Sequence, residues 1–283
     1  MRHLSLTFFV FTTLISLSRP LLGDPTAIRI IASGEEKMRG QSTQTLLTMR
    51  IVRPSFTREL KLRAWTVKGK NALVEILEPS KEEGVVSLRN GDQMWNYLPK
   101  TDQVVRVPSS LMLQSWMGSD FTNDDLMKAS SLLTDYTQRI LKKGMLRGEK
   151  VVLIECRPKP NAPVVWGKVL YWARQTDSLP VQEKYYDERN RWVRTLAFSG
   201  FKKMDDRTVP TVIRVTKADE PKEFTVVRYH KILYDRKLER SLFDKEDVRK
   251  LSFRGKSLDW GWFQSPSMAK KPKALHASPV RIR

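Results

Sequence analysis

Side chains that carry out covalent chemistry are scarce in this sequence. Its 283 residues include one cysteine and three histidines. Cys156 alone can form neither an internal disulfide nor a metal cage. Because His3 lies near the start of the chain and His276 near its end, His230 is the one histidine expected in the folded domain. We therefore expect neither a Ser-His-Asp triad nor a zinc site, and we predict a protein that is not an enzyme and needs no cofactor or metal.

Motifs that bind phosphate or activate a serine are missing as well. The sequence has no glycine-rich phosphate loop and no Gly-x-Ser-x-Gly segment. Asp120, Asp124 and Asp125 form an acidic group, but their spacing lacks the alternating oxygen ligands of a calcium loop. Thr122 or Asn123 is a good helix N-cap, and carboxylates are favoured in the first turn that follows. Helix capping therefore explains these aspartates better than metal binding.

Long apolar runs are rare, and the longest one lies at the start. Residues 4–17 read LSLTFFVFTTLISL after a basic Arg2, and Gly23 offers a small residue before a cleavage point. This layout predicts a secretory signal peptide over residues 1–23. A membrane anchor is the alternative, although the run is shorter than the ~20 apolar residues of a span and contains Ser and Thr. Because no cysteine follows the run, we expect no lipid anchor on the mature N-terminus.

Acidic residues are outnumbered. The sequence has 51 Lys and Arg against 31 Asp and Glu, so the formal net charge is +20, and loss of Arg2 and Arg19 with the signal lowers it to +18. Such a charge predicts attraction to polyanions such as anionic membrane surfaces. Export argues against nucleic acid as the partner. The basic residues are spread along strands such as residues 58–65, so a solvated surface explains part of the excess equally well.

The hydrophobic pattern predicts one antiparallel sheet. A helix is expected over residues 26–38, ending at Gly40. From Thr43 onward the apolar period is two, and Asn90-Gly91 is typical of a tight hairpin. Close, even spacing without intervening helices favours a continuous antiparallel sheet. The expected strands are residues 44–52, 57–67, 71–78, 84–89, 93–98, 103–107, 136–146, 149–156, 165–173, 179–187, 192–204, 210–217 and 223–234.

These patterns divide the chain into three parts. After the signal peptide we expect one domain over residues 24–255, closed by a short helix over residues 241–251 with Ser241 as its cap. Residues 256–283 have no apolar periodicity and carry a formal charge of +5. This composition predicts a basic tail without a fixed structure.

The segment between the two groups of strands, residues 109–133, has little strand alternation and is rich in large apolar residues. It predicts a helical lid over a hydrophobic cavity, with the Met117-Gly118-Ser119 junction as a hinge. Small-molecule sites are concave and mainly apolar, and methionine adapts to variable hydrocarbon. For each such residue taken alone, an ordinary core is the better explanation, and it is the cluster as a whole that favours a cavity. The candidate ligand-binding residues are Trp65, Trp95, Tyr97, Met112, Leu113, Trp116, Met117, Phe121 and Leu126.

Three segments together resemble a known family. Residues 50–65 read RIVRPSFTRELKLRAW, residues 91–108 read GDQMWNYLPKTDQVVRVP, and residues 110–126 read SLMLQSWMGSDFTNDDL. They resemble the LolA-like family of outer-membrane lipoprotein-sorting proteins, and the resemblance extends from about residue 26 to about residue 251. It implies a mainly β fold: an unclosed antiparallel β-barrel of the LolA/LolB type, whose helical lid encloses a hydrophobic cavity. It also implies the periplasm of a Gram-negative bacterium.

The resemblance implies a carrier that performs no covalent chemistry. Such a protein would hold the acyl chains of lipoproteins or other lipids, receive them from an inner-membrane transporter and pass them to an outer-membrane acceptor. The alternative is a lipid-sensing or accessory module that binds an envelope protein, such as an RND-type transporter. We do not match LolA's own lid-locking residues to positions in this sequence, so none are assigned.

Overall fold

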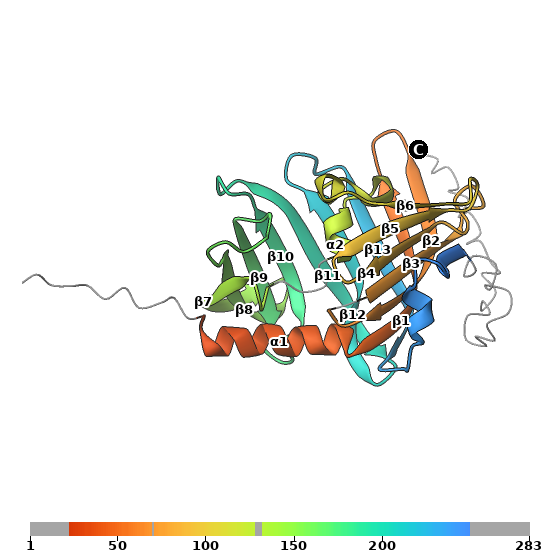
Figure 1. Cartoon of the computed structure of the whole chain (residues 1–283). Helices are drawn as coiled ribbons and strands as arrows, with labels where there is room; N and C mark the ends of the chain where they lie inside the picture. The colour runs from red at the N-terminus through yellow and green to blue at the C-terminus, as the bar shows by residue number, and fades with distance from the viewer. Residues whose placement is uncertain (1–22, 70, 128–131, 250–283) are drawn as a thin grey trace, which may run out of the picture.

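The computed structural model describes residues 23–69, 71–127 and 132–249, and in these ranges all strands belong to one sheet of 13 (Figure 1). The strand order is β6-β5-β4-β3-β2-β1-β13-β12-β11-β10-β9-β8-β7. The strands are β1 Ser42–Val52, β2 Thr57–Val67, β3 Asn71–Glu78, β4 Val86–Asn90, β5 Gln93–Leu98, β6 Gln103–Arg106, β7 Tyr136–Leu146, β8 Glu149–Pro158, β9 Lys168–Arg174, β10 Pro180–Tyr186, β11 Trp192–Met204, β12 Arg207–Lys217 and β13 Phe224–Tyr234.

Every neighbouring pair in this sheet is antiparallel, and the chain passes from each strand to an adjacent one except between β6 and β7. β6 and β7 form the two edges, and β1 pairs with β13, so the halves β1–β6 and β7–β13 join through the first and last strands. Over the described residues no pairing joins β6 to β7, which leaves the sheet unclosed. The predicted fold, an unclosed antiparallel barrel with a few helices, is confirmed.

Helix α1, Pro25–Arg39, runs beneath the curved sheet (Figure 1). The Asp24 side chain accepts hydrogen bonds from the amides of Thr26 and Ala27, and Gly40 ends the helix at a φ of 55° that favours glycine. Ala27 and Ile31 are fully buried in a core cluster with residues of β7, β8 and β9. Of the helices in the described ranges, none combines the length and apolar character that crossing a membrane requires.

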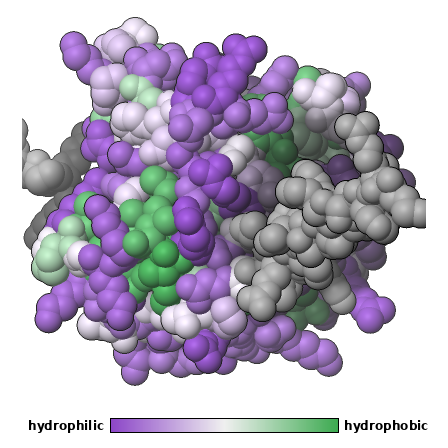
Figure 2. Space-filling view, turned by 90° about the vertical axis from the view of Figure 1, so that its left-hand side faces the viewer, coloured by the Kyte–Doolittle hydropathy of each residue, from purple (hydrophilic) through white to green (hydrophobic). Residues whose placement is uncertain are grey.

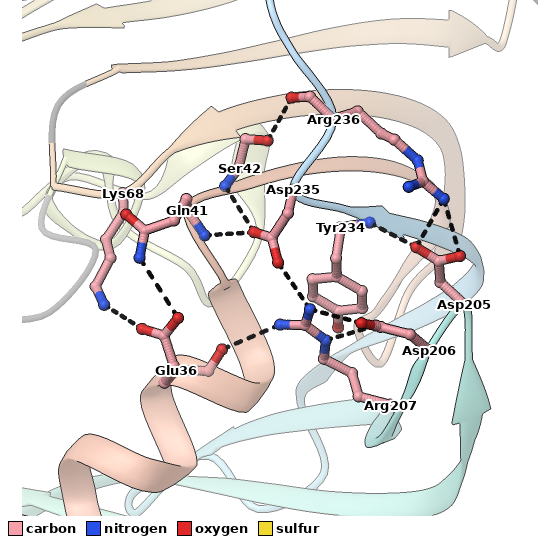
Figure 3. Close-up of polar contacts among 10 residues, drawn as sticks. All are labelled: Glu36, Gln41, Ser42, Lys68, Asp205, Asp206, Arg207, Tyr234, Asp235 and Arg236. Atoms are coloured by element: carbon pink, nitrogen blue, oxygen red, sulfur yellow. Dashed lines mark hydrogen bonds and ion pairs between the residues drawn. The ribbon is translucent and has the colours of Figure 1, made fainter.

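A polar network fixes the C-terminal end of α1 to the sheet (Figure 3). Arg207 donates to Asp206 and to Asp235, at 2.7 Å each, and its Nη1 donates to the carbonyl of Glu36 at the end of α1. Asp235 in turn accepts the backbone N–H of Gln41, at 2.6 Å, in the connection that leads to β1. The network therefore positions the end of α1, which lies against the cavity described below.

In residues 109–127, the lid segment contains short helical turns. These are the 3-10 turns η1, Ser109–Leu111, and η2, Trp116–Gly118, followed by α2, Asn123–Met127. The prediction of a closing helix over residues 241–251 is wrong for its first half. The structure has a 3-10 turn there, η3, Arg240–Phe243, which begins one residue before Ser241. Residues 250 and 251 of that prediction, the basic tail and nearly all of the signal peptide lie outside the described residues.

The outer face of β2–β5 is covered by the region around η3. Trp65, Leu88 and Tyr97 are buried there against Phe243 and Val248.

On the end of the molecule that Figure 2 shows, an apolar area lies among mainly hydrophilic side chains. Edge strand β7 carries exposed Leu141 and Met145. Cys156 is fully buried in the cluster between α1 and the sheet, and burial raises the pKa of its thiol far above the ordinary value.

Candidate functional site: a lidded apolar cavity

A cavity of about 390 Å³ lies between the concave face of the sheet, α1 and the lid segment. Its volume falls within the ~300–1,000 Å³ typical of small-molecule sites. Side chains alternate between the two faces of a strand, so every second residue of β1 and β2 points into it. The apolar part of the lining includes Leu47, Met49, Leu62, Ala64, Val74, Leu196, Phe198, Ile213 and Val227.

The lid supplies the apolar roof of this cavity. Trp116, Phe121 and Leu126 all line it, and Trp116 is 3% exposed. The indole N–H of Trp116 donates to Ser87 Oγ at 2.9 Å, and the Ser87 hydroxyl donates to Asn96 at 2.7 Å. The first bond satisfies the one polar atom of the indole, and the ring packs in a core cluster that borders the cavity.

The other predicted ligand-binding residues lie in different places. Trp65, Trp95 and Tyr97 belong to the cluster on the outer face of the sheet. Trp65 alternates with Ala64 and Thr66, which line the cavity, and Trp95 follows Met94, which packs in the cluster of Trp116. Met112 and Met117 are partly buried and pack against the core cluster that contains Trp116. Leu113 is 56% exposed. The structure therefore brings three of the nine candidates together at the cavity wall: Trp116, Phe121 and Leu126.

One anchor of the lid is a buried ion pair that joins it to the sheet. The Asp120 side chain has no exposed surface, and its carboxylate accepts from Arg53 Nη2 at 3.1 Å and from the Thr225 hydroxyl at 2.7 Å. The backbone N–H of Asp120 donates to the same hydroxyl at 3.0 Å. Arg53 follows β1 and Thr225 lies in β13, so this anchor is built from the two strands that join the halves of the sheet. The expected capping role of Asp120 is wrong, since the residue pairs with the sheet.

A second anchor joins α2 to the other half of the sheet. Arg194 in β11 is 4% exposed and donates from both Nη atoms to the Asp125 carboxylate, at 2.6 and 2.7 Å. Its guanidinium lies 4.7 Å from the ring centroids of both Trp166 and Tyr185. Burial alone would raise the pKa of Asp125, but hydrogen bonds and the charge of Arg194 lower it below the ordinary value.

Asp125 also caps its own helix, as the sequence predicts. Its carboxylate accepts from the backbone N–H of Thr122 at 2.8 Å, while the Thr122 hydroxyl accepts from the N–H of Asp125 at 3.2 Å. This is a reciprocal capping box.

The predicted hinge has an unusual backbone. Met117 has a φ of 52° and Gly118 a φ of 72°, both in the left-handed region. For Met117 this conformation is uncommon, and it is held because Arg58 donates to its carbonyl at 3.1 Å. Arg53 donates to the carbonyl of Gly118 at 3.0 Å. Motion at this junction stays a prediction.

One buried carboxylate interrupts the apolar lining. Glu183 in β10 lines the cavity and is 9% exposed. The Tyr185 hydroxyl donates to its Oε2 at 2.5 Å. Burial raises the pKa of Glu183 to about 7, against the lowering effect of that hydrogen bond. As for metals, the described residues contain no cluster of three or more histidine, cysteine or carboxylate side chains suited to bind one.

Sequence reasoning missed the residues that hold the lid and the one that breaks the apolar lining. Arg53, Arg194 and Glu183 are single charged residues in or beside strands, like many others in this basic chain. The local sequence contains no signal for Arg194 and Glu183. For Arg53 and Asp120 the only hint was that both lie in the segments that resemble the LolA-like family.

The fold and the cavity define the class of this protein: it has the LolA-like fold. Three solved structures resemble it. A DUF1329 family protein from Desulfovibrio piger has a TM-score of 0.72 at 22% identity, over 79% of this chain and 98% of that one. A domain from Vibrio parahaemolyticus described as an outer membrane lipoprotein-sorting protein has a TM-score of 0.68 at 19% identity, over 79% and 98%. A LolA superfamily protein from Nitrosomonas europaea has a TM-score of 0.66 at 23% identity, over 78% and 98%.

The family follows from the sequence itself. The model of a DUF1329-like family, described as uncharacterized protein, matches residues 68–250, which is more than half of the chain. The chain belongs to this family. None of the curated proteins is significantly similar to it in sequence. Because the structural similarities lie below 25% identity, they establish the fold and leave the activity to be argued from the cavity.

Proposed function

We propose that this protein is a periplasmic carrier that holds the acyl chains of lipoproteins or other lipids and moves them toward the outer membrane, without covalent chemistry. The observation that carries this proposal is the lidded apolar cavity, roofed by Trp116, Phe121 and Leu126. Burying hydrocarbon stabilises a complex by about 0.8 kcal/mol per methylene, so a chain of about twelve carbons contributes on the order of 10 kcal/mol before entropic losses. Such a complex releases its ligand slowly unless the lid opens.

The two ion pairs suit a lid that must open and close. Arg53–Asp120 and Arg194–Asp125 hold the lid to the two halves of the sheet, and each is a discrete contact that can break and reform. A donor or acceptor membrane protein that competes for these groups would control loading and release. The expected partners are an inner-membrane transporter as donor and an outer-membrane acceptor, and the basic surface favours an anionic membrane beside them.

Substitution of the roof tests the proposal. Trp116→Asp or Phe121→Asp places a carboxylate against the apolar cavity, so we expect binding of a fluorescent fatty-acyl probe to be lost while the β-rich circular dichroism spectrum is retained. Leu113→Asp is the matched control, because Leu113 belongs to the same segment but is 56% exposed. Its probe affinity should equal that of the wild type. If both roof variants bind the probe with wild-type affinity, the lid is not part of the ligand-binding site.

The alternative is a lipid-sensing or accessory module that binds an envelope protein such as an RND-type transporter. Mass spectrometry of lipids that co-purify with the protein separates the two functions. Stoichiometric lipid supports the carrier, whereas an empty cavity in a protein that binds a protein partner tightly supports the sensor.

A further inference from the structure

Glu183 is a polar exception in the wall of an apolar cavity. It lies in β10 on the same face as Tyr185, two residues along the strand, and both side chains line the cavity. Tyr171 of β9 lines the same region. A carboxylate at such a position is costly to bury unless a partner compensates its charge.

The protein compensates the charge of the buried Glu183 carboxylate only in part. Over the described residues, the one hydrogen bond to the Glu183 carboxylate comes from the neutral Tyr185 hydroxyl and reaches Oε2. Arg194 lies over the Tyr185 ring, where both of its Nη atoms bind Asp125 and its Nε has no hydrogen-bond partner. Burial raises the pKa of Glu183 and outweighs the charges of Arg39 and Arg194, which lower it. The ion pairs within the described ranges do not include Glu183. Its Oε1 thus has no donor from this part of the chain.

We propose that Glu183 is the head-group acceptor of the cavity and binds the protonated amine of a long-chain amphiphile whose hydrocarbon lies against Leu47, Phe198 and Ile213. An ammonium group supplies the positive charge and the hydrogen-bond donor that Oε1 lacks, so the pair would form with little water present. Amphiphiles with carboxylate heads meet like charge there and bind more weakly. This inference rests on the proposed function and names the ligand class of the same cavity.

The titration of Glu183 supports this assignment. Burial raises its pKa to about 7, so the carboxylate is ionised at pH 8 and largely protonated at pH 6. The charged and titratable groups around it are Glu35 and Arg39 of α1, Cys156 of β8, Tyr171 of β9, Tyr185 beside it, Arg194 of β11, and Asp124 and Asp125 of α2. An alkylamine stays protonated across this range, so its affinity should rise from pH 6 to pH 8 as Glu183 ionises.

Three probes with the same chain test the proposal: dodecylamine, dodecanol and dodecanoate, each displacing a fluorescent acyl probe from the mature protein at pH 8. We expect dodecylamine to bind on the order of tenfold more tightly than dodecanol, and dodecanoate to bind most weakly. In Glu183→Gln the three affinities should lie within about threefold of one another, with dodecanol unchanged. Glu188→Gln, at an exposed position in the turn after β10, should keep the wild-type order.

Tyr185→Phe provides a second, independent readout. Loss of its hydroxyl removes a bond that lowers the pKa of Glu183, so the rise of dodecylamine affinity with pH should move to higher pH. An amine preference that persists in Glu183→Gln, or tighter binding of dodecanoate than of dodecylamine, would overturn the inference while leaving the carrier proposal standing. Failure of all three amphiphiles to bind would overturn both.

Discussion

Replacing Arg53 with alanine removes the cation that neutralises Asp120, the fully buried carboxylate of the lid. The variant leaves that carboxylate with the hydroxyl of Thr225 as its remaining side-chain partner. Breaking one side of a buried ion pair costs about 3–5 kcal/mol, and because Arg53 is 13% exposed we expect the lower end, ~3 kcal/mol. The loss falls on the lid first, since the strands keep their ladder hydrogen bonds.

Amide hydrogen exchange measures this loss locally. The Trp116 N–H, which donates to the carbonyl of Phe121 at 2.7 Å, reports on the folded lid. A loss of ~3 kcal/mol corresponds to exchange that is on the order of a hundredfold faster at this amide. Amides in the centre of β11 should exchange at their wild-type rate.

The double variant Arg53→Ala with Asp120→Ala is the matched control, because it removes the orphaned charge together with its partner. It should exchange more slowly at Trp116 than Arg53→Ala alone. With Asp120→Ala as the second single variant, the four exchange rates form a double-mutant cycle that gives the coupling energy of the pair. If the single variant accelerates exchange less than threefold, or if the double variant is no slower, Arg53–Asp120 does not hold the lid.

Two further predictions concern buried titratable groups. Because the pKa of Glu183 rises from an ordinary 4.5 to about 7 on folding, the folded protein binds more protons between these values, and the free energy of unfolding should fall by about 3 kcal/mol as pH rises from 4.5 to 7. Glu183→Gln has no carboxylate to titrate, so its free energy of unfolding should not fall over this pH range. Chemical unfolding should show the variant to be more stable than the wild type at pH 8 by up to about 3 kcal/mol. A stability difference between variant and wild type that is the same at pH 4 and pH 8 would contradict the raised pKa of Glu183. Cys156 is fully buried and burial raises the pKa of its thiol, so a thiol reagent at pH 8 should label it in denaturant and leave it unmodified in the native protein; rapid native labelling would refute its burial.

The strands were predictable because their signals are local. Residues 57–67, 93–98 and 192–204 show alternation bounded by turn residues, and the structure has β2, β5 and β11 at these bounds. The strands β4 and β5 pair antiparallel as the Asn90-Gly91 signal predicts, although Asn90 ends β4 and the two-residue turn is Gly91-Asp92. The helix at the start was predictable for the same reason, since its cap and its terminal glycine adjoin its apolar residues.

The inward face of β2–β5 was not predictable, because both faces of the sheet are covered there. Trp65 lies between Ala64 and Thr66, which line the cavity, but all three are compatible with a buried position. The alternation of side chains along a strand assigns them to two faces of the sheet, but it does not indicate which face encloses a cavity. Trp65, Trp95 and Tyr97 were therefore assigned to the cavity although they lie on the outer face, beneath the region around η3.

The contacts that hold the lid depend on distances along the chain that no local pattern encodes. Asp120 meets Arg53 from 67 residues earlier and Thr225 from 105 residues later. These residues meet because β1 pairs with β13, the first strand with the last. Glu183 is likewise ordinary in sequence and becomes distinctive only because β10 turns it inward.

Photo-crosslinking with a dodecyl chain that carries a terminal diazirine tests the central claim most directly, because the reagent marks the residues that contact hydrocarbon. Mass spectrometry of the labelled protein should place the adducts on inward-facing residues of the sheet and lid, such as Leu47, Phe198 and Phe121. Adducts confined to the outer surface, or labelling that an excess of unlabelled dodecyl ligand does not suppress, would contradict an acyl-binding cavity.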